Sequence, residues 1–288
     1  MTRLAVLGTG RIGGEAAYVS SILGIIDELV VYDTAHDLLN AQVLDLVQTG
    51  LDIPISSDTR LVKQADICIF AAGLPRDPTV KTRADLLGAN IPVLNTCMNL
   101  LHGFSGVLIT VTNPMDVNNY YLSIKAGLDR ERCIGFGGQL DSARFGVALR
   151  EKGISGTPWI LGEHGDYQVP VFSRLPGTTS IPLREEILTG LKASSMQIIK
   201  GKGGTVFGPA YHIAMLVNAI ATDSRDLLAC SAILDGEYGM KDCSLGVPVK
   251  VGKNGICSIE EWDLDAWEQE KLGAAARFVG ELCKTAVG

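Results

Sequence analysis

The run Leu4-Ala5-Val6-Leu7-Gly8-Thr9-Gly10-Arg11-Ile12-Gly13-Gly14 sets the architecture of this 288-residue chain. Its first four residues are apolar and predict a strand, and the residues after Gly14 follow a helical pattern. A Gly-x-Gly-x-x-Gly spacing alone is weak evidence, but a strand before it and a helix after it are the context of a dinucleotide-binding turn. The glycines permit the turn, let the backbone approach a pyrophosphate and let helix pack on strand, while the helix N-terminus attracts phosphate.

The second predicted strand, Leu29 to Tyr32, ends at Asp33, which lies 20 residues beyond Gly13 (33 − 13 = 20). An acid at the tip of this strand can accept hydrogen bonds from both ribose hydroxyls of NAD. The same charge would repel the 2′-phosphate of NADP, and no arginine follows immediately to hold that phosphate. Asp33 therefore predicts NAD, and the alternative is an ordinary aspartate at a strand end.

Two further apolar runs, 67–72 and 106–111, are continuous enough to be central strands that are covered on both faces. Strands that alternate with helical patterns predict βαβ units and a doubly wound parallel sheet. In such sheets ligands bind beyond the carboxyl ends of the strands. Four polar or glycine residues are predicted at those ends: Gly8, Asp33, Gly73 and Asn113.

The segment 74–83 follows the third of these strands and contains two prolines and three cations. This composition is typical of a mobile lid, and its position would place it over the cofactor. The alternative is a solvated surface loop, which is the usual fate of charged loops.

One histidine of the four in the chain stands in a polar turn, Gly162-Glu163-His164-Gly165-Asp166, between two apolar strand-like runs. Histidine exchanges a proton near neutral pH, so His164 is the catalytic candidate; a solvated turn histidine is the alternative. Asp141 and Arg144 are three residues apart at the start of a helical pattern, so their side chains share a face. Asp141 would orient the histidine and Arg144 would grip a carboxylate, unless the two form a simple surface ion pair.

The composition excludes several classes of protein. With 47% apolar residues, 20% charged residues and a net charge of −7, the chain is expected to fold and not to bind nucleic acid. No apolar run approaches the ~18–20 residues of a membrane span, and no signal peptide is expected ahead of the strand that begins at Leu4. The seven cysteines are scattered without a Cys-x-x-Cys pair, which indicates reduced thiols in a cytoplasmic protein and no metal site.

The second half of the chain is expected to be rich in helix. Residues 191–230 are interpreted as long helices, which the glycine-containing segment 202–210 interrupts. Residues 245–257 predict a hairpin with its turn at Asn254-Gly255. Residues 260–285 predict a closing amphipathic helix.

Taken in order, the glycine turn, Asp33, the cationic loop, Val111-Thr-Asn-Pro114, Asp141-Ser-Ala-Arg144 and Gly162-Glu-His-Gly-Asp166 resemble the L-lactate/L-malate dehydrogenases over the whole length of the chain. The sequence looks closest to the branch of lactate-dehydrogenase-like malate dehydrogenases. The resemblance implies an α/β fold: a Rossmann doubly wound parallel sheet in an NAD-binding domain at 1–140, then an α+β substrate-binding domain at 141–288.

The resemblance also implies roles for single residues. His164 would donate and accept the proton of the substrate C2 oxygen, and Asp141 would stabilise its charged form. Arg144 would hold the C1 carboxylate, Asn113 would contact substrate and nicotinamide, and Arg83 would polarise the C2 oxygen when the loop closes. The remaining implied contacts are Thr205 for the substrate and, for NAD, Gly8, Thr9, Gly10, Arg11, Ile12, Gly13, Asp33, Ala72, Gly73, Asn90, Val111, Thr112 and Asn113.

The choice of substrate is expected to depend on Arg76, three residues after Gly73. The lactate enzymes of the family resemble one another in having Gln there, and the malate enzymes in having Arg. An arginine would pair with the second carboxylate of oxaloacetate but would be left unpaired against the methyl group of pyruvate, which is costly. Because the loop is one residue longer than the family pattern, Lys81 is an alternative to Arg83.

The resemblance therefore implies an NAD-dependent malate dehydrogenase of the tricarboxylic acid cycle, acting on a small dicarboxylate. A lactate or other 2-hydroxy-acid dehydrogenase and a catalytically idle NAD-binding protein remain as alternatives. The family habit implies a homotetramer or homodimer with the helix 37–49 near an interface.

Overall fold

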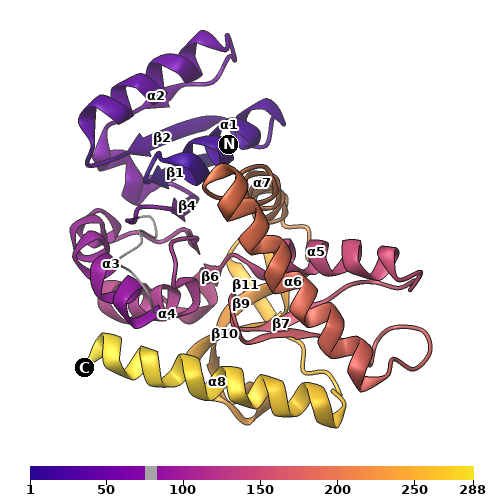
Figure 1. The fold of residues 1–288 in the computed structure, drawn as a ribbon. Coiled ribbons are helices and arrows are strands. Elements are labelled where there is room, and N and C mark those ends of the chain that lie inside the picture. Colours follow the sequence, from indigo (N-terminus) through magenta and orange to yellow (C-terminus); the bar gives the residue numbers. More distant parts are fainter. Residues whose placement is uncertain (75–82) are drawn as a thin grey trace.

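One mixed sheet runs through the whole molecule in the computed structural model, which describes residues 1–74 and 83–288 (Figure 1). The strands are β1 (Arg3–Leu7), β2 (Glu28–Tyr32), β3 (Ile55–Ser56), β4 (Ile67–Phe70), β5 (Val107–Thr110), β6 (Cys133–Gly135), β7 (Ile160–Gly162), β8 (Gln168–Pro170), β9 (Leu227–Asp235), β10 (Lys241–Gly252) and β11 (Gly255–Ile259). The α-helices are α1 (Arg11–Ile22), α2 (His36–Gln48), α3 (Arg83–Met98), α4 (Met115–Ala126), α5 (Gly138–Glu151), α6 (Ile181–Lys202), α7 (Phe207–Ala221) and α8 (Ala266–Val287). Short 3-10 helices are η1 (Thr59–Gln64), η2 (Asn99–Leu101), η3 (Arg130–Arg132) and η4 (Glu237–Gly239).

The first half of the sheet is parallel, in the order β3-β2-β1-β4-β5-β6. Alternate residues of the central strand β1 enter different cores: Leu4 and Val6 pack with the residues of α1, whereas Ala5 and Leu7 pack with those of α3 and α4. Helices therefore cover both faces, as continuous apolar strands require. The predicted doubly wound α/β fold is confirmed.

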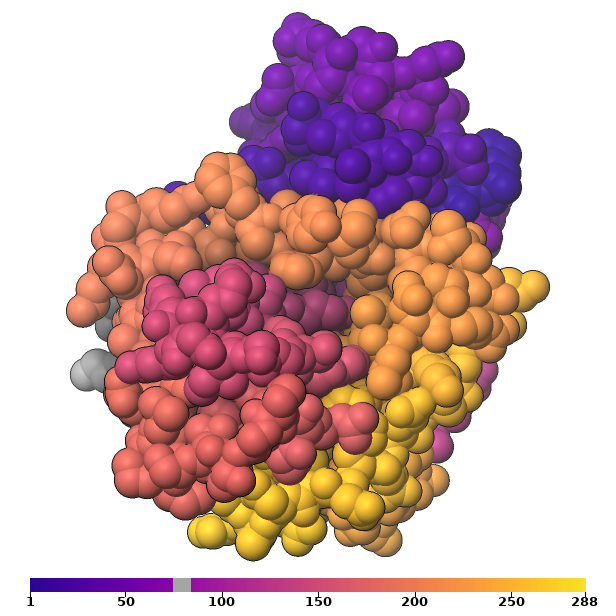
Figure 2. All heavy atoms as spheres, turned by 90° about the vertical axis from the view of Figure 1, so that its right-hand side faces the viewer, coloured from indigo at the N-terminus to yellow at the C-terminus, as the bar shows by residue number. Residues whose placement is uncertain are grey.

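The sheet continues into the second half without a break. Gly135 of β6 pairs with Ser231 of β9 in an antiparallel bridge, and β10, β7 and β8 follow. On one face α4 and α8 pack against each other and against β10, and on the other α7 packs against α1 and α5 against β9 (Figure 1). In Figure 2 the indigo N-terminal residues form a lobe that rests on orange residues of the second half. This junction brings the predicted turn at His164 to the carboxyl edge of the parallel strands.

The prediction of helices over 191–230 is wrong at its end, because β9 begins at Leu227. The segment from Ala229 to Leu234 is buried in the middle of the sheet. A continuous apolar run has no period that separates a buried strand from a buried helix.

The hairpin of β10 and β11 is confirmed, but its turn lies one residue earlier than predicted. Gly252 pairs with Gly255, so the loop is Lys253-Asn254. Gly255 has a φ of +99°, and a Cβ there would lie 2.1 Å from the carbonyl oxygen of Glu131. Glycine is therefore required at position 255 because another backbone segment approaches the start of β11, and not because of the turn.

Within the described ranges, no single helix is long and apolar enough to cross a bilayer. The pair α6 and α7 would reach the required length and composition only as two halves, which meet at 113°.

Candidate active site

The glycine turn after β1 is built as the spacing predicts. Gly8 has a φ of +94°, and a Cβ there would lie 2.3 Å from the backbone nitrogen of Ala72. A Cβ on Gly13 would lie 1.9 Å from the carbonyl oxygen of Gly8, so only glycine lets α1 approach β1. Gly10 faces open space and caps the N-terminus of α1. The turn therefore leaves an accessible backbone surface at a positive helix end, which suits a pyrophosphate.

Asp33 is held rigidly beside this turn. Its carboxylate accepts the backbone N–H of Thr9 at 2.8 Å and that of Ala35 at 2.9 Å. Gln42 of α2 donates to the carbonyl oxygen of Thr9 at 3.0 Å, which fixes the turn from the other side. The carboxylate at the tip of β2 and the open turn thus lie side by side, as binding of a ribose and a pyrophosphate requires.

The ends of β4 and β5 meet in a tight backbone contact. The hydroxyl of Thr112 donates to the carbonyl oxygen of Ala72 at 2.7 Å, and a Cβ on Gly73 would lie 2.4 Å from Thr112 Cγ2. Val111 continues β5 through a hydrogen bond from its N–H to Phe70. The four predicted cofactor contacts at these strand ends lie at the same edge of the sheet.

Asn90 of α3 braces this edge. It is fully buried; its side-chain oxygen accepts the N–H of Leu74 at 2.7 Å, and its amide nitrogen donates to the carbonyl oxygen of Asn113 at 2.9 Å. Both polar atoms of the side chain are therefore engaged by the protein. The direct cofactor contact expected for Asn90 stays a prediction, and the geometry adds a role in holding the two strand ends together.

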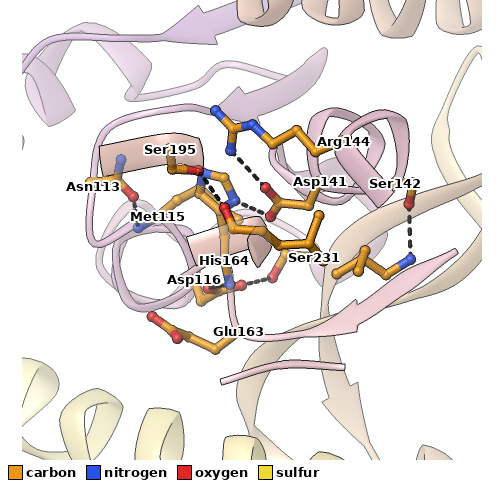
Figure 3. A network of polar contacts seen from close by, with 12 residues as sticks. Asn113, Met115, Asp116, Asp141, Ser142, Arg144, Glu163, His164, Ser195 and Ser231 are labelled. Atoms are coloured by element: carbon orange, nitrogen blue, oxygen red, sulfur yellow. Dashed lines mark hydrogen bonds and ion pairs between the residues drawn. The ribbon is translucent and has the colours of Figure 1, made fainter. Parts of the chain in front are cut away.

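His164 and Asp141 form a close pair (Figure 3). His164 Nδ1 lies 2.6 Å from Asp141 Oδ2, and Arg144 Nη1 donates to Asp141 Oδ1 at 3.0 Å. The Asp141 side chain is 1% exposed, against 19% for His164 and 17% for Arg144. The carboxylate is thus shielded from water, while the imidazole and the guanidinium remain accessible from one side.

The electrostatics of Asp141 favour an ionised carboxylate. Burial alone would raise its pKa, but the adjacent His164 and Arg144 outweigh burial and hold the pKa of this carboxyl below its usual range. A carboxylate that is ionised and bonded to Nδ1 favours the tautomer with its proton on Nδ1 and favours the imidazolium form. The other ring nitrogen is then the one that exchanges a proton with a ligand.

The ring of His164 is also positioned sterically by Gly137, which precedes α5. A Cβ on Gly137 would lie 2.5 Å from His164 Cγ and 2.6 Å from Nδ1. Any side chain at this position would push the imidazole away from Asp141.

The structure shows fewer interactions for two other predicted substrate contacts, Asn113 and Thr205. Asn113, which precedes a cis bond to Pro114, is exposed, and its side-chain oxygen accepts the N–H of Met115 at 3.3 Å. Thr205 is half-buried in the connection between α6 and α7. Three residues later, a Cβ on Gly208 would lie 2.8 Å from Leu140, the neighbour of Asp141, so this connection lies near the start of α5.

Residues 75–82 of the predicted lid 74–83, which include Arg76 and Lys81, lie outside the described residues. Arg83 is the first residue of α3, and its side chain is likewise outside the described part.

Sequence reasoning missed three polar residues of this region. Asp116 accepts the backbone N–H of His164 at 2.8 Å, and Ser231 donates to Asp116 at 2.6 Å. Ser195 of α6 is drawn among these residues in Figure 3, and its hydroxyl donates to Leu191 at 3.4 Å. The sequence carries no side-chain pattern for Asp116, because its bond goes to a backbone N–H 48 residues away.

Together these residues offer a phosphate cradle, a ribose-binding acid, a proton-exchanging histidine and an arginine for an anion. The open Gly10 surface and the carboxylate of Asp33 fit a dinucleotide. In residues 1–74 and 83–288, no group of three His, Cys, Asp or Glu side chains could hold a metal ion.

Comparison with known proteins gives matches over the whole chain. The NAD binding domain of lactate/malate dehydrogenase matches residues 2–135, and the alpha/beta C-terminal domain of lactate/malate dehydrogenase matches residues 138–285. A malate dehydrogenase of Haloarcula marismortui is 40% identical, covering 98% of each chain, and an L-lactate dehydrogenase of Bacillus velezensis is 30% identical, covering 98% of this chain and 96% of that one. The solved malate dehydrogenase of Archaeoglobus fulgidus in complex with NADH superimposes with a TM-score of 0.90 at 32% identity, covering 99% of each chain.

Proposed function

The chain belongs to the lactate/malate dehydrogenase family, and on that premise we propose that it is an NAD-dependent enzyme that interconverts L-malate and oxaloacetate. The observation that carries the chemistry is the pair His164–Asp141, 2.6 Å apart, with the carboxylate buried and the imidazole accessible. The malate dehydrogenase of Haloarcula marismortui is 40% identical to this chain and the L-lactate dehydrogenase of Bacillus velezensis is 30% identical, which supports malate over lactate as the substrate. The NAD binding domain and the NADH complex support the cofactor.

In the proposed mechanism His164 protonates the C2 oxygen of oxaloacetate during reduction and removes the same proton during oxidation of malate. Asp141 holds the imidazole through Nδ1 and stabilises its charged form. Arg144, of which one guanidinium nitrogen is engaged by Asp141, has its remaining donors for the C1 carboxylate. Bound NAD supplies the hydride chemistry at C4 of its nicotinamide.

The cofactor would be held by the residues of the parallel sheet edge. The N–H groups at the start of α1 would face the pyrophosphate, and Asp33 would accept hydrogen bonds from the adenosine ribose. Asn113, exposed at the end of β5, would meet both the nicotinamide and the substrate. The Arg76 and Arg83 side chains would contribute the second anion site and the polarising charge, as the family resemblance implies.

An oligomer is proposed from the apolar surface of the N-terminal half. Three large apolar side chains of α2 are exposed, Leu38 at 40%, Leu44 at 59% and Val47 at 57%. Ile22 and Leu23 at the end of α1 are exposed as well. These exposed apolar side chains support the proposal of a homodimer or homotetramer with α2 near an interface. A cytoplasmic location is proposed because all seven cysteines are free thiols and six of them are buried.

The test of this function is NADH consumption with oxaloacetate, measured on the native protein and on His164→Asn. The native protein should turn over, whereas the variant should bind NADH with the same Kd by fluorescence and lose about 10²- to 10⁴-fold in kcat, the usual worth of a general acid. A native protein that binds NADH but reduces neither oxaloacetate nor pyruvate would contradict the proposal and favour an idle NAD-binding protein.

A further inference from the structure

The backbone of His164 is held by a second carboxylate, that of Asp116. Asp116 is the second residue of α4, is 2% exposed, and accepts the His164 N–H at 2.8 Å through Oδ2 (Figure 3). Its other oxygen, Oδ1, accepts the hydroxyl of Ser231 at 2.6 Å. Thus Asp141 restrains the imidazole ring and Asp116 restrains the main chain that carries it.

The hydroxyl of Ser231 begins a buried chain of hydrogen bonds whose direction can be derived. Because Ser231 donates its only proton to Asp116, it must accept from Ser244, 2.8 Å away. Ser244 in turn accepts from the amide nitrogen of Asn119 at 3.0 Å, and the side-chain oxygen of Asn119 accepts from Thr110 at 3.0 Å. Every donor in the chain therefore points toward the Asp116 carboxylate, an arrangement in which each bond polarises the next.

This chain joins the elements on which the proposed active site is built. Thr110 ends β5 and leads to Asn113, and Asp116 and Asn119 lie on α4. Ser231 lies on β9 and Ser244 on β10, the two strands that connect the parallel half to the hairpin of His164. The network consequently links the cofactor edge of the sheet to the proton-exchanging residue across the β6–β9 junction.

The environment of Asp116 disfavours the charged form of its carboxyl group. Burial, and then the charge of Glu163, raise its pKa to about 6, against the opposing bonds from Ser231 and the His164 N–H. Burial, and to a smaller extent the charge of Asp116, raise the pKa of the Cys243 thiol on β10 and of the Cys283 thiol on α8. A buried carboxylate needs hydrogen-bond partners to remain charged, and the His164 N–H and the Ser231 hydroxyl supply them in a fixed geometry.

We propose that Asp116 is a positioning residue for the dehydrogenase reaction: through the His164 backbone, and supported by Ser231, it sets the position from which the imidazole reaches the substrate oxygen. This proposal rests on the proposed function for its kinetic consequence but not for its structural one. A misplacement of about 1 Å at a reacting group costs about 10²-fold in rate, so the network should act on kcat and leave ligand binding unchanged.

The structural consequence can be measured without substrate or cofactor. Histidine-selective ¹⁵N labelling gives four amide signals, because the chain has four histidines. The His164 amide proton should resonate far downfield in the native protein, as expected for a bond to a carboxylate, and should move upfield in Asp116→Asn. An unchanged His164 signal in that variant would overturn the proposal, whether or not the protein reduces oxaloacetate.

The kinetic consequence is measured on the same variants. Asp116→Asn should lower kcat for oxaloacetate at least about tenfold, and Ser231→Ala about three- to tenfold, with KM and the Kd of NADH within about twofold of native values. The matched control is Ser123→Ala on α4, which also removes a buried hydroxyl. This hydroxyl donates to the carbonyl oxygen of Leu128 at 2.9 Å and lies outside the network. Equal effects of Ser231→Ala and Ser123→Ala, or a loss that falls on KM alone, would contradict a positioning role.

Discussion

At the scale of single residues, the proposed function depends on the hydrogen bonds between two carboxylates and one histidine. Asp141 is bonded to the ring of His164 and Asp116 to its backbone. The pKa of Asp141 is held below its usual range against the cost of burial, and the charge of His164 is the first cause of that lowering. By reciprocity, the Asp141 carboxylate favours the protonated imidazole to the same extent.

Asp141→Asn should therefore shift the pH dependence of the enzyme. Oxaloacetate reduction requires protonated His164, so kcat/KM falls as pH rises through the ionisation of the imidazole. Without the Asp141 charge the imidazole loses its proton more easily, and the fall should move to lower pH by about one to three pH units. A pH profile of kcat/KM with NADH and oxaloacetate measures this.

The control for that experiment is Asp166→Asn, which removes an exposed acid from the same turn. It should move the profile little, because solvent screens an exposed charge. A profile that stays at the native position in Asp141→Asn would show that the pair does not govern the proton transfer.

The difference between Asp141 and Asp116 also explains which residues of the site could be predicted from the sequence. Asp141 was predicted because its three-residue spacing from Arg144 places two side chains on one helix face. Asp116 was not, because it is 48 residues from His164 and bonds to a backbone N–H, which leaves no side-chain pattern. Contacts to the main chain are fixed by the fold, and residue types alone do not identify them.

At the scale of elements, the strongest local signals gave the most accurate predictions. The β1–turn–α1 unit was predicted because the whole pattern, an apolar strand, three spaced glycines and a helix, lies in one short run of sequence. Strand β9 was missed because a strand that is buried on both faces has no period. The closing helix was predicted from its amphipathic pattern, and its start is fixed by a capping box of Asp265 and Glu268.

The interactions at the N-terminus of α8 should contribute measurably to the free energy of unfolding. Asp265 accepts the Glu268 N–H at 3.0 Å and pairs with the largely buried Arg184 of α6. Burial opposes this charge, but the Glu268 N–H and Arg184 hold the pKa of Asp265 below its usual range. Asp265→Ala should lower the free energy of unfolding in urea by about 1–2 kcal/mol at neutral pH.

The sign of the pH dependence follows from that lowered pKa. The contribution of Asp265 is present above its unfolded-state pKa and is lost as pH falls through the folded-state pKa. The difference between native and Asp265→Ala should therefore shrink toward acid. Asp263→Ala, an exposed acid two residues earlier, is the control and should change stability by less than about 0.5 kcal/mol. Equal losses in both variants would contradict the capping role.

At the scale of the whole molecule, the site exists because the sheet crosses from one half to the other. The parallel half brings the cofactor edge together, and the β6–β9 bridge places the hairpin of β7 and β8 beside it. The parallel order could be predicted from alternating strands and helices. The continuous sheet could not, because a single bridge between Gly135 and Ser231 has no local signature.

The central claim concerns which acid is reduced, and the most direct measurement is the ratio of kcat/KM for oxaloacetate to that for pyruvate, with NADH, in native protein and Arg76→Gln. An arginine that pairs with the second carboxylate should give the native protein a ratio of about 10² or more, because leaving a buried charge unpaired costs several kcal/mol. The variant should lose most of that preference. A native protein that prefers pyruvate would contradict malate dehydrogenase activity and support the lactate alternative.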